Sequence, residues 1–296
     1  MIKINISNGV LEMIKTEYLR KINGKTFRPK QRNAMHDFWF EKKDDIITAD
    51  PEKLNAFISD FNALGADQEV FIVFKKYMAN LYDNRVDKLW LMKELKINTC
   101  HYCNRQYTFT VEKARSVQDE NNIKPQFDHF FPKSKYPYLA LSFYNLIPSC
   151  PTCNIVKQEA EIGVNPYQSG FDDTGCGFIL LDKHTNLSPV AYNSDIKIVF
   201  QNANANTQKN ISVFGLEELY NEHMDYVGEI INKAMAYTNG YYESLIHSFQ
   251  GLGHTPPEIE RYVWGVYLEM ADYGNRPLSK LTRDVLNQIG IKRNNC

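Results

Sequence analysis

The chain has 296 residues, 43% of them apolar, and a formal net charge of −1 at pH 7. This length suffices to bury a core, and the near-neutral charge argues against a protein that coats nucleic acid through global basicity. The sequence has no apolar run of about 18 residues and does not begin like a secretory signal, so we expect a cytoplasmic protein without membrane spans.

The N-terminal third is predicted to be helical. Asp50 followed by Pro51 is typical of a helix start, and one apolar helical face continues from there until Gly65. Apolar and aromatic residues recur at helical spacing from Asp67 to about Lys96, which favours core packing. Earlier, residues 20–32 carry six basic residues and no acid, and this stretch fits either a phosphate contact or a solvated charge run.

Four cysteines in two Cys-x-x-Cys pairs mark the centre of the chain: Cys100, Cys103, Cys150 and Cys153. Two intervening residues form a tight turn that brings both thiolates of a pair to one metal, so the four cysteines predict a tetrahedral zinc site. In a reducing compartment paired cysteines hold metal more often than they form disulfides. His101 lies inside the first pair, but four thiolates already complete the tetrahedron, so we do not expect it to bind zinc.

The segment framed by the cysteines carries polar residues suited to hydrolysis of a phosphodiester: Asp128, His129, Asn145 and Asn154. A strand is predicted over residues 127–131, and Pro132 ends it. Strand alternation turns Asp128 and His129 to opposite faces, so a shared site requires the strand to end or bulge there. A loop and return strand would follow, and a helix would begin at the second cysteine pair, giving a ββα order.

Three lysines near these residues, Lys133, Lys135 and Lys157, are candidates for contact with nucleic acid. Between residues 124 and 157 the only acid is Asp128, so this segment is locally basic although the whole chain is neutral. Lys157 fits either a phosphate contact or an ordinary solvated position.

The C-terminal part is predicted to begin with two short strands in residues 177–201, followed by a polar connector from Asn202. Helical spacing returns in residues 216–249, after Thr255, and in residues 277–290. We therefore predict an α+β, mainly α chain in three segments: a helical region (1–96), a zinc-stapled centre (97–170), and a short β stretch followed by helices (171–296).

The cysteine pairs, the Asp-His pair and the two asparagines together resemble the HNH endonucleases, a ββα-metal family. The resemblance covers residues 100–165. It implies that His129 is the general base, that Asp128 and Asn154 bind the catalytic cation, and that Asn145 holds the loop and orients the base. An asparagine in place of the histidine found in many members favours Mg²⁺, or Mn²⁺, at this position.

The resemblance implies cleavage of DNA that leaves 5′-phosphate and 3′-hydroxyl ends. A chain of this length with helical flanks also resembles the effector subunits of bacterial anti-phage systems that pair with an ATPase, specifically the Septu type. Two alternatives stay open. One is an RNase that uses the same centre, and the other is an inactive zinc-stabilised module that binds nucleic acid or protein.

Overall fold

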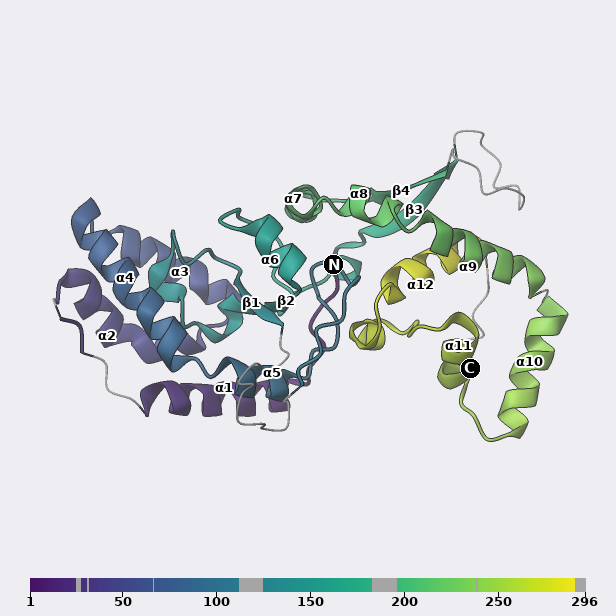
Figure 1. Ribbon diagram of the computed structural model, residues 1–296, viewed down its shortest axis with the longest axis horizontal. Coiled ribbons are helices and arrows are strands. Elements are labelled where there is room, and N and C mark those ends of the chain that lie inside the picture. The colour runs from purple at the N-terminus through teal and green to yellow at the C-terminus, as the bar shows by residue number, and fades with distance from the viewer. Residues whose placement is uncertain are drawn as a thin grey trace, which may run out of the picture. The chain divides into compact units, whose positions relative to one another are not determined.

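The computed structural model describes residues 1–24, 28–30, 32–65, 67–111, 125–182, 196–237 and 239–290. Within these ranges the chain is mainly helical, with two small antiparallel sheets of two strands each (Figure 1). Among the described helices, none combines the length and apolar character needed to cross a membrane.

The chain divides into two compact units, each assembled from separate stretches of sequence. Unit 1 comprises Met1–Lys3, Asn98–Tyr107 and Ser169–Cys296, and unit 2 comprises Ile4–Ile97 and Thr108–Gln168. This partition differs from the three consecutive segments predicted from sequence, because the N-terminal helices and the central Asp-His segment fall in one unit.

The N-terminal region, predicted to be helical, forms five helices at the start of unit 2. They are α1 (Asn8–Asn23), α2 (Ala34–Thr48), α3 (Pro51–Asn62), α4 (Gln68–Arg85) and α5 (Lys88–Leu95). Side chains of Asn33, Asp67 and Asp87 accept backbone N–H groups at the starts of α2, α4 and α5. The helical pattern from Asp67 to Lys96 is therefore two helices, because Asp87 caps a new one.

The sheet of unit 2 pairs β1 (Gln126–His129) with β2 (Leu146–Ser149), and α6 (Pro151–Lys157) follows directly. Asp128 lies opposite Ile147, and His129, the last strand residue, lies opposite Leu146. Two short 3₁₀ turns, Pro137–Leu139 and Phe143–Asn145, shape the connection. Figure 1 shows α6 beside this pair of strands, which is the strand-strand-helix order predicted from sequence.

The N-terminal helices hold the connection between β1 and β2. The hydroxyl of Tyr18 in α1 donates to the Leu141 carbonyl at 2.9 Å, and the indole N–H of Trp39 in α2 donates to the Tyr138 carbonyl at 3.2 Å. Phe61 of α3 stacks on the Tyr138 ring, with 3.8 Å between ring centroids. Buried groups of three helices therefore fix a loop that has little regular structure of its own.

Unit 1 contains the second sheet, β3 (Gly177–Asp182) with β4 (Ile196–Gln201), and a short 3₁₀ turn at Asp172–Thr174. Two strands were predicted in this stretch, and their presence confirms that prediction. Helices and one further 3₁₀ turn follow: α7 (Ala205–Phe214), α8 (Leu216–Asn221), α9 (Met224–Ala236), α10 (Asn239–Gly251), α11 (Pro256–Trp264), Met270–Asn275 and α12 (Ser279–Gln288).

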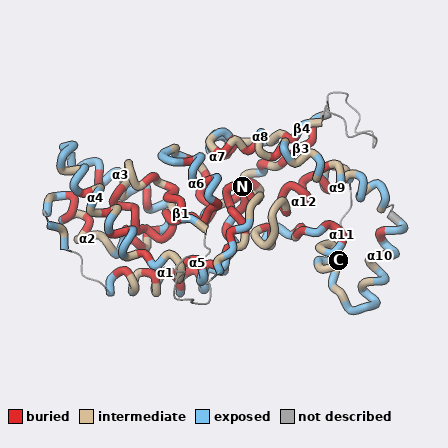
Figure 2. The backbone as a smooth tube through the Cα atoms, viewed as in Figure 1, coloured by how far each residue is buried: buried red, intermediate tan, exposed pale blue. Residues whose placement is uncertain are grey.

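The predicted polar connector after Asn202 is wrong, because α7 begins within it. The Asn204 side chain accepts from the backbone N–H groups of Asn206 and Thr207 and so caps the helix. Thr207 and Asn210 are buried, so polar residues occupy part of the inner face of α7. Buried and exposed residues alternate along α7 (Figure 2), whereas most residues of α10 are exposed.

Candidate functional site

The thiol groups of the four predicted zinc ligands come together. Ligand atoms of Cys100, Cys103, Cys150 and Cys153 all lie within 4.8 Å of one another, and all four residues are buried. Four clustered thiols match the donor set and number of a closed structural zinc site. The residues therefore fit a zinc ion, as the cysteine spacing predicted. His101 is not part of this cluster, and its Nδ1 lies 3.0 Å from the Thr99 carbonyl.

The first cysteine pair sits in a tight turn that the rest of unit 1 holds in place. Asn104 adopts a left-handed conformation with φ of 47°, and its backbone N–H donates to the Cys100 carbonyl. The Asn104 side chain donates to the Tyr273 carbonyl at 3.1 Å, and the Tyr220 hydroxyl donates to the Cys103 carbonyl. These bonds tie the first cysteine pair to the rest of unit 1.

The second pair lies at the start of α6. Cys150 is the N-cap residue, and its sulfur accepts the backbone N–H of Cys153 at 3.4 Å. The backbone N–H of Cys153 thus points at a sulfur that would bind the metal. A metal held here would fix the beginning of α6, the helix that carries Asn154 and Lys157.

Asp128 faces α6 and forms a buried ion pair with Lys157. The lysine ammonium lies 3.1 and 3.2 Å from the two carboxylate oxygens and donates to the His129 carbonyl at 2.6 Å. Burial lowers the pKa of Lys157, although Asp128 opposes this effect. The ammonium group is enclosed, so the structure places it on the carboxylate and not on a surface where it could meet a phosphate directly.

Asn154 lies on the same side of β1. Its amide nitrogen is 2.6 Å from the side-chain oxygen of Gln126, which precedes Asp128 by two residues and so shares its strand face. Asn154 and Lys157 are three residues apart on α6, a spacing that places them on one helix face. The structure thus brings the two predicted oxygen ligands, Asp128 and Asn154, to the interface of β1 and α6.

His129 turns to the other side of β1, where its ring packs edge-on against Tyr82 of α4 at 4.6 Å between centroids. Its Nε2 lies 3.1 Å from the Ala140 carbonyl. A carbonyl only accepts, so Nε2 carries the proton and Nδ1 keeps the lone pair in the neutral ring. Burial lowers the pKa of His129 to about 3, against the bond to Ala140 that raises it, and Lys133 lowers it further.

Asn145 ties the two ends of the loop together. Its side-chain oxygen accepts the Phe131 N–H at 2.7 Å, and its amide nitrogen donates to the carbonyls of Phe131 and Leu139 at 3.2 and 2.9 Å. Leu139 directly precedes Ala140, whose carbonyl holds His129. Asn145 therefore positions the partner of the histidine, which is the loop-holding arrangement that the HNH resemblance implies.

The structure also places residues near His129 that sequence reasoning missed. The ammonium groups of Lys88 and Lys133 lie 4.2 and 4.9 Å from the centroid of the Tyr82 ring that covers the histidine. Lys133 was a predicted contact for nucleic acid, whereas Tyr82 and Lys88 come from α4 and α5. The third candidate lysine, Lys135, pairs with Glu161 at 3.5 Å.

Asp128 and His129 are only 3% and 7% exposed, so neither residue is open to solvent. They lie on the two faces of a strand that ends at His129, as alternation predicts. Both residues are therefore enclosed, His129 beneath Tyr82 and Asp128 beneath Lys157.

Comparisons with protein-family models, with curated proteins and with solved structures return no match to this chain. The geometry and chemistry of the site therefore carry any assignment of function.

Proposed function

We propose that the chain is a metal-dependent nuclease of the HNH type that hydrolyses DNA. The observation that carries the proposal is a series of hydrogen bonds around the end of β1. Asn145 holds the loop, the loop carbonyl of Ala140 holds His129, and α6 covers the face of Asp128 with Asn154. These residues all belong to unit 2, with His129 on one face of β1 and Asp128 and Asn154 on the other, and the second cysteine pair begins α6 in the same unit.

In this proposal His129 acts as the general base. Its neutral ring is oriented by Ala140 with Nδ1 unprotonated, so Nδ1 is the atom that takes the proton from an attacking water. Lys133, near Tyr82, adds positive charge beside the histidine and would attract the phosphate, whereas Lys88 is paired with Asp83 at 3.2 Å.

Asp128 and Asn154 supply carboxylate and amide oxygens, the ligand types that Mg²⁺ and Mn²⁺ prefer. Lys157 already neutralises Asp128, so the carboxylate would share its oxygens between the ammonium group and the cation. When bound, the cation would stabilise negative charge on the leaving oxygen.

A second candidate function is a zinc-stabilised binding module without activity. The observation that favours it is the closed centre, in which Asp128 is paired with Lys157 and His129 is covered by Tyr82. A binding module needs the cysteines and the fold but needs no open path to the base.

Incubation of the purified protein with plasmid DNA and with structured RNA, each with Mg²⁺ and with EDTA, separates these functions. The proposal predicts Mg²⁺-dependent loss of supercoiled plasmid. Cleavage of RNA alone would identify an RNase, and cleavage of neither, by protein that has kept its zinc, would favour the binding module. The link to anti-phage defence and to an ATPase partner rests on sequence resemblance alone.

A further inference from the structure

Unit 2 contains a strongly basic pocket whose lining includes none of the candidate site residues described above. Its volume is about 890 Å³, within the range of roughly 300–1,000 Å³ that is typical of small-molecule sites. The residues that line it come from the segment before α2, from α2 and from α4: Arg28, Pro29, Lys30, His36, Val73, Lys76, Tyr77, Asn80, Leu81 and Arg85. Four of these described residues are cations and none is Asp or Glu, so the lining favours an anion.

His36 supplies a buried polar atom that points to a ligand. The residue is fully buried, its Nδ1 lies 2.7 Å from the Asn33 side-chain oxygen, and its Nε2 has no hydrogen-bond partner among the described residues. The Asn33 oxygen also caps α2 by accepting two backbone N–H groups, so it is an acceptor here. Nδ1 therefore donates, and Nε2 of this pocket-lining residue is left as an acceptor.

Tyr77 supplies a second such atom. Its ring lies 4.9 Å from the His36 ring, and its buried hydroxyl has no hydrogen-bond partner among the described residues. Buried polar atoms are normally hydrogen-bonded, and two of the buried atoms without a partner among the described residues belong to this one pocket. A ligand that satisfies both atoms must have a hydrogen-bond donor for His36 Nε2 and an acceptor for the Tyr77 hydroxyl.

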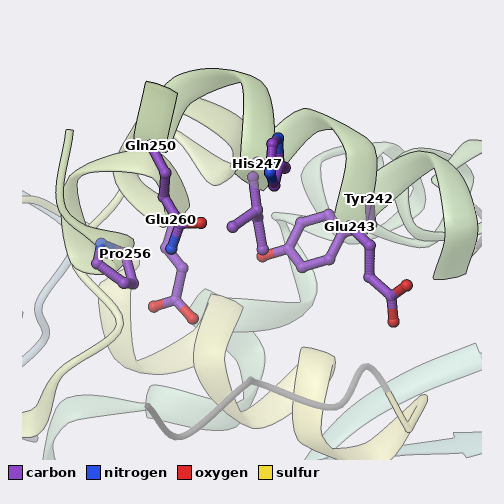
Figure 3. Close-up of a pocket in the computed structure, with 7 residues that line it drawn as sticks. Tyr242, Glu243, His247, Gln250, Pro256 and Glu260 are labelled. Carbon is purple, nitrogen blue, oxygen red and sulfur yellow. The ribbon is translucent and has the colours of Figure 1, made fainter. Parts of the chain in front are cut away.

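The smaller pocket between α10 and α11 lacks these features. Figure 3 shows that Glu243 and His247 come from one helix and Glu260 from the other. Its volume is about 220 Å³, and its described lining has two acids and neither lysine nor arginine, so it does not suit a phosphate.

We propose that the basic pocket binds a nucleotide. The phosphate would be held by the cations, chiefly Lys76 and Arg85 of α4, with the Tyr77 hydroxyl donating to it. A sugar hydroxyl or a base N–H would donate to His36 Nε2, a role that bare phosphate fills poorly. The apolar side chains of Val73 and Leu81 give the base or sugar a surface to pack on.

This inference does not depend on catalysis by His129, so the two proposals can fail separately. The shared chemistry is a phosphorylated nucleoside, which is either a free nucleotide or one residue of a single strand. Residues 20–32 fitted either a phosphate contact or a solvated charge run in the sequence. Two of the basic residues in this stretch, Arg28 and Lys30, line the pocket, where both could contact the phosphate of one nucleotide.

Isothermal titration calorimetry of the full chain without added divalent cation tests the inference, with AMP, ATP, pyrophosphate and a short single-stranded oligonucleotide as separate probes. Lys76→Gln should weaken binding roughly tenfold, because it removes one charge-assisted contact, and Tyr77→Phe should weaken it roughly threefold. Lys75→Gln is the matched control, since Lys75 is adjacent on α4 and does not line the pocket.

Saturable binding of AMP or ATP that the two pocket variants weaken and the control does not would support a free nucleotide. The same pattern with the oligonucleotide alone would support a strand as the source. Equal weakening by Lys75→Gln, pyrophosphate binding as tight as that of ATP, or no saturable binding of any probe would overturn the inference.

Discussion

Lys157 and Asp128 form a buried ion pair in which each charge is compensated by the other. Removing the ammonium alone leaves a buried carboxylate without a counter-charge, which costs about 3–5 kcal/mol in comparable pairs. We expect Lys157→Met to lower the free energy of unfolding by about that amount in zinc-loaded protein without added Mg²⁺. If Asp128 binds a hard cation, added Mg²⁺ should recover part of the loss, because the cation replaces the ammonium. Urea unfolding with and without Mg²⁺ measures both effects.

The double variant Asp128→Asn with Lys157→Met is the control, because it removes both charges. It should be more stable than Lys157→Met when no Mg²⁺ is added and should show no response to Mg²⁺. A Mg²⁺ response that survives the loss of Asp128, or none in Lys157→Met, would mean that the cation does not bind at this carboxylate.

At the scale of single elements, α7 provides a test of local capping. Asn204→Ala removes a side chain that accepts two backbone N–H groups, so the free energy of unfolding should fall by about 1 kcal/mol. Ser7→Ala is the matched control, since Ser7 precedes α1 but makes no capping bond with its side chain. Urea unfolding of both variants measures the difference, and equal losses would contradict the capping role.

The elements themselves were largely predictable, because apolar periodicity and Pro or Gly signals are local. The helix after Pro51 and the paired strands in residues 177–201 follow from such signals. The start of α7 was missed because asparagine is read as a loop residue until its capping bonds are seen.

The residues of the candidate site could be proposed from the sequence, but the contacts that their side chains make could not. Residue types and spacing identified Asp128, His129 and the cysteines, but the pairing of Lys157 with Asp128 depends on how α6 packs on β1. Tyr82 meets His129 only through packing of α4 on the loop, and no motif in the sequence marks that contact.

At the scale of the whole molecule, zinc should be required for stability. A structural zinc site contributes on the order of 10–16 kcal/mol of apparent binding energy, so Cys150→Ser should lose the metal and much of its thermal stability. Cys176→Ser is the matched control, because Cys176 is equally buried but lies outside the cluster. Elemental analysis and thermal unfolding measure the outcome. Folded Cys150→Ser protein with full zinc content would contradict the site.

Acid should destabilise the protein through three buried histidines, His36, His101 and His129, and the half-buried His223. Burial lowers the pKa values of His36, His101, His129 and His223 below the ordinary 6.5. Below that pH the unfolded chain binds protons that the folded chain does not, so the free energy of unfolding should fall as pH falls from 7 towards about 4. His36 lies away from the cysteines, so His36→Gln should reduce this slope without involving zinc. A slope that the variant leaves unchanged would contradict the assignment to His36.

The central claim is that the centre around His129 performs hydrolysis. The most direct measurement is the rate of Mg²⁺-dependent DNA cleavage by wild type, His129→Ala and His247→Ala at matched zinc content. The exposed His247 is the control, because it lies on α10 in unit 1. We predict that His129→Ala cleaves at least about 10²-fold more slowly, the usual contribution of a general base, while His247→Ala cleaves like wild type. Cleavage by His129→Ala at the wild-type rate would contradict the account.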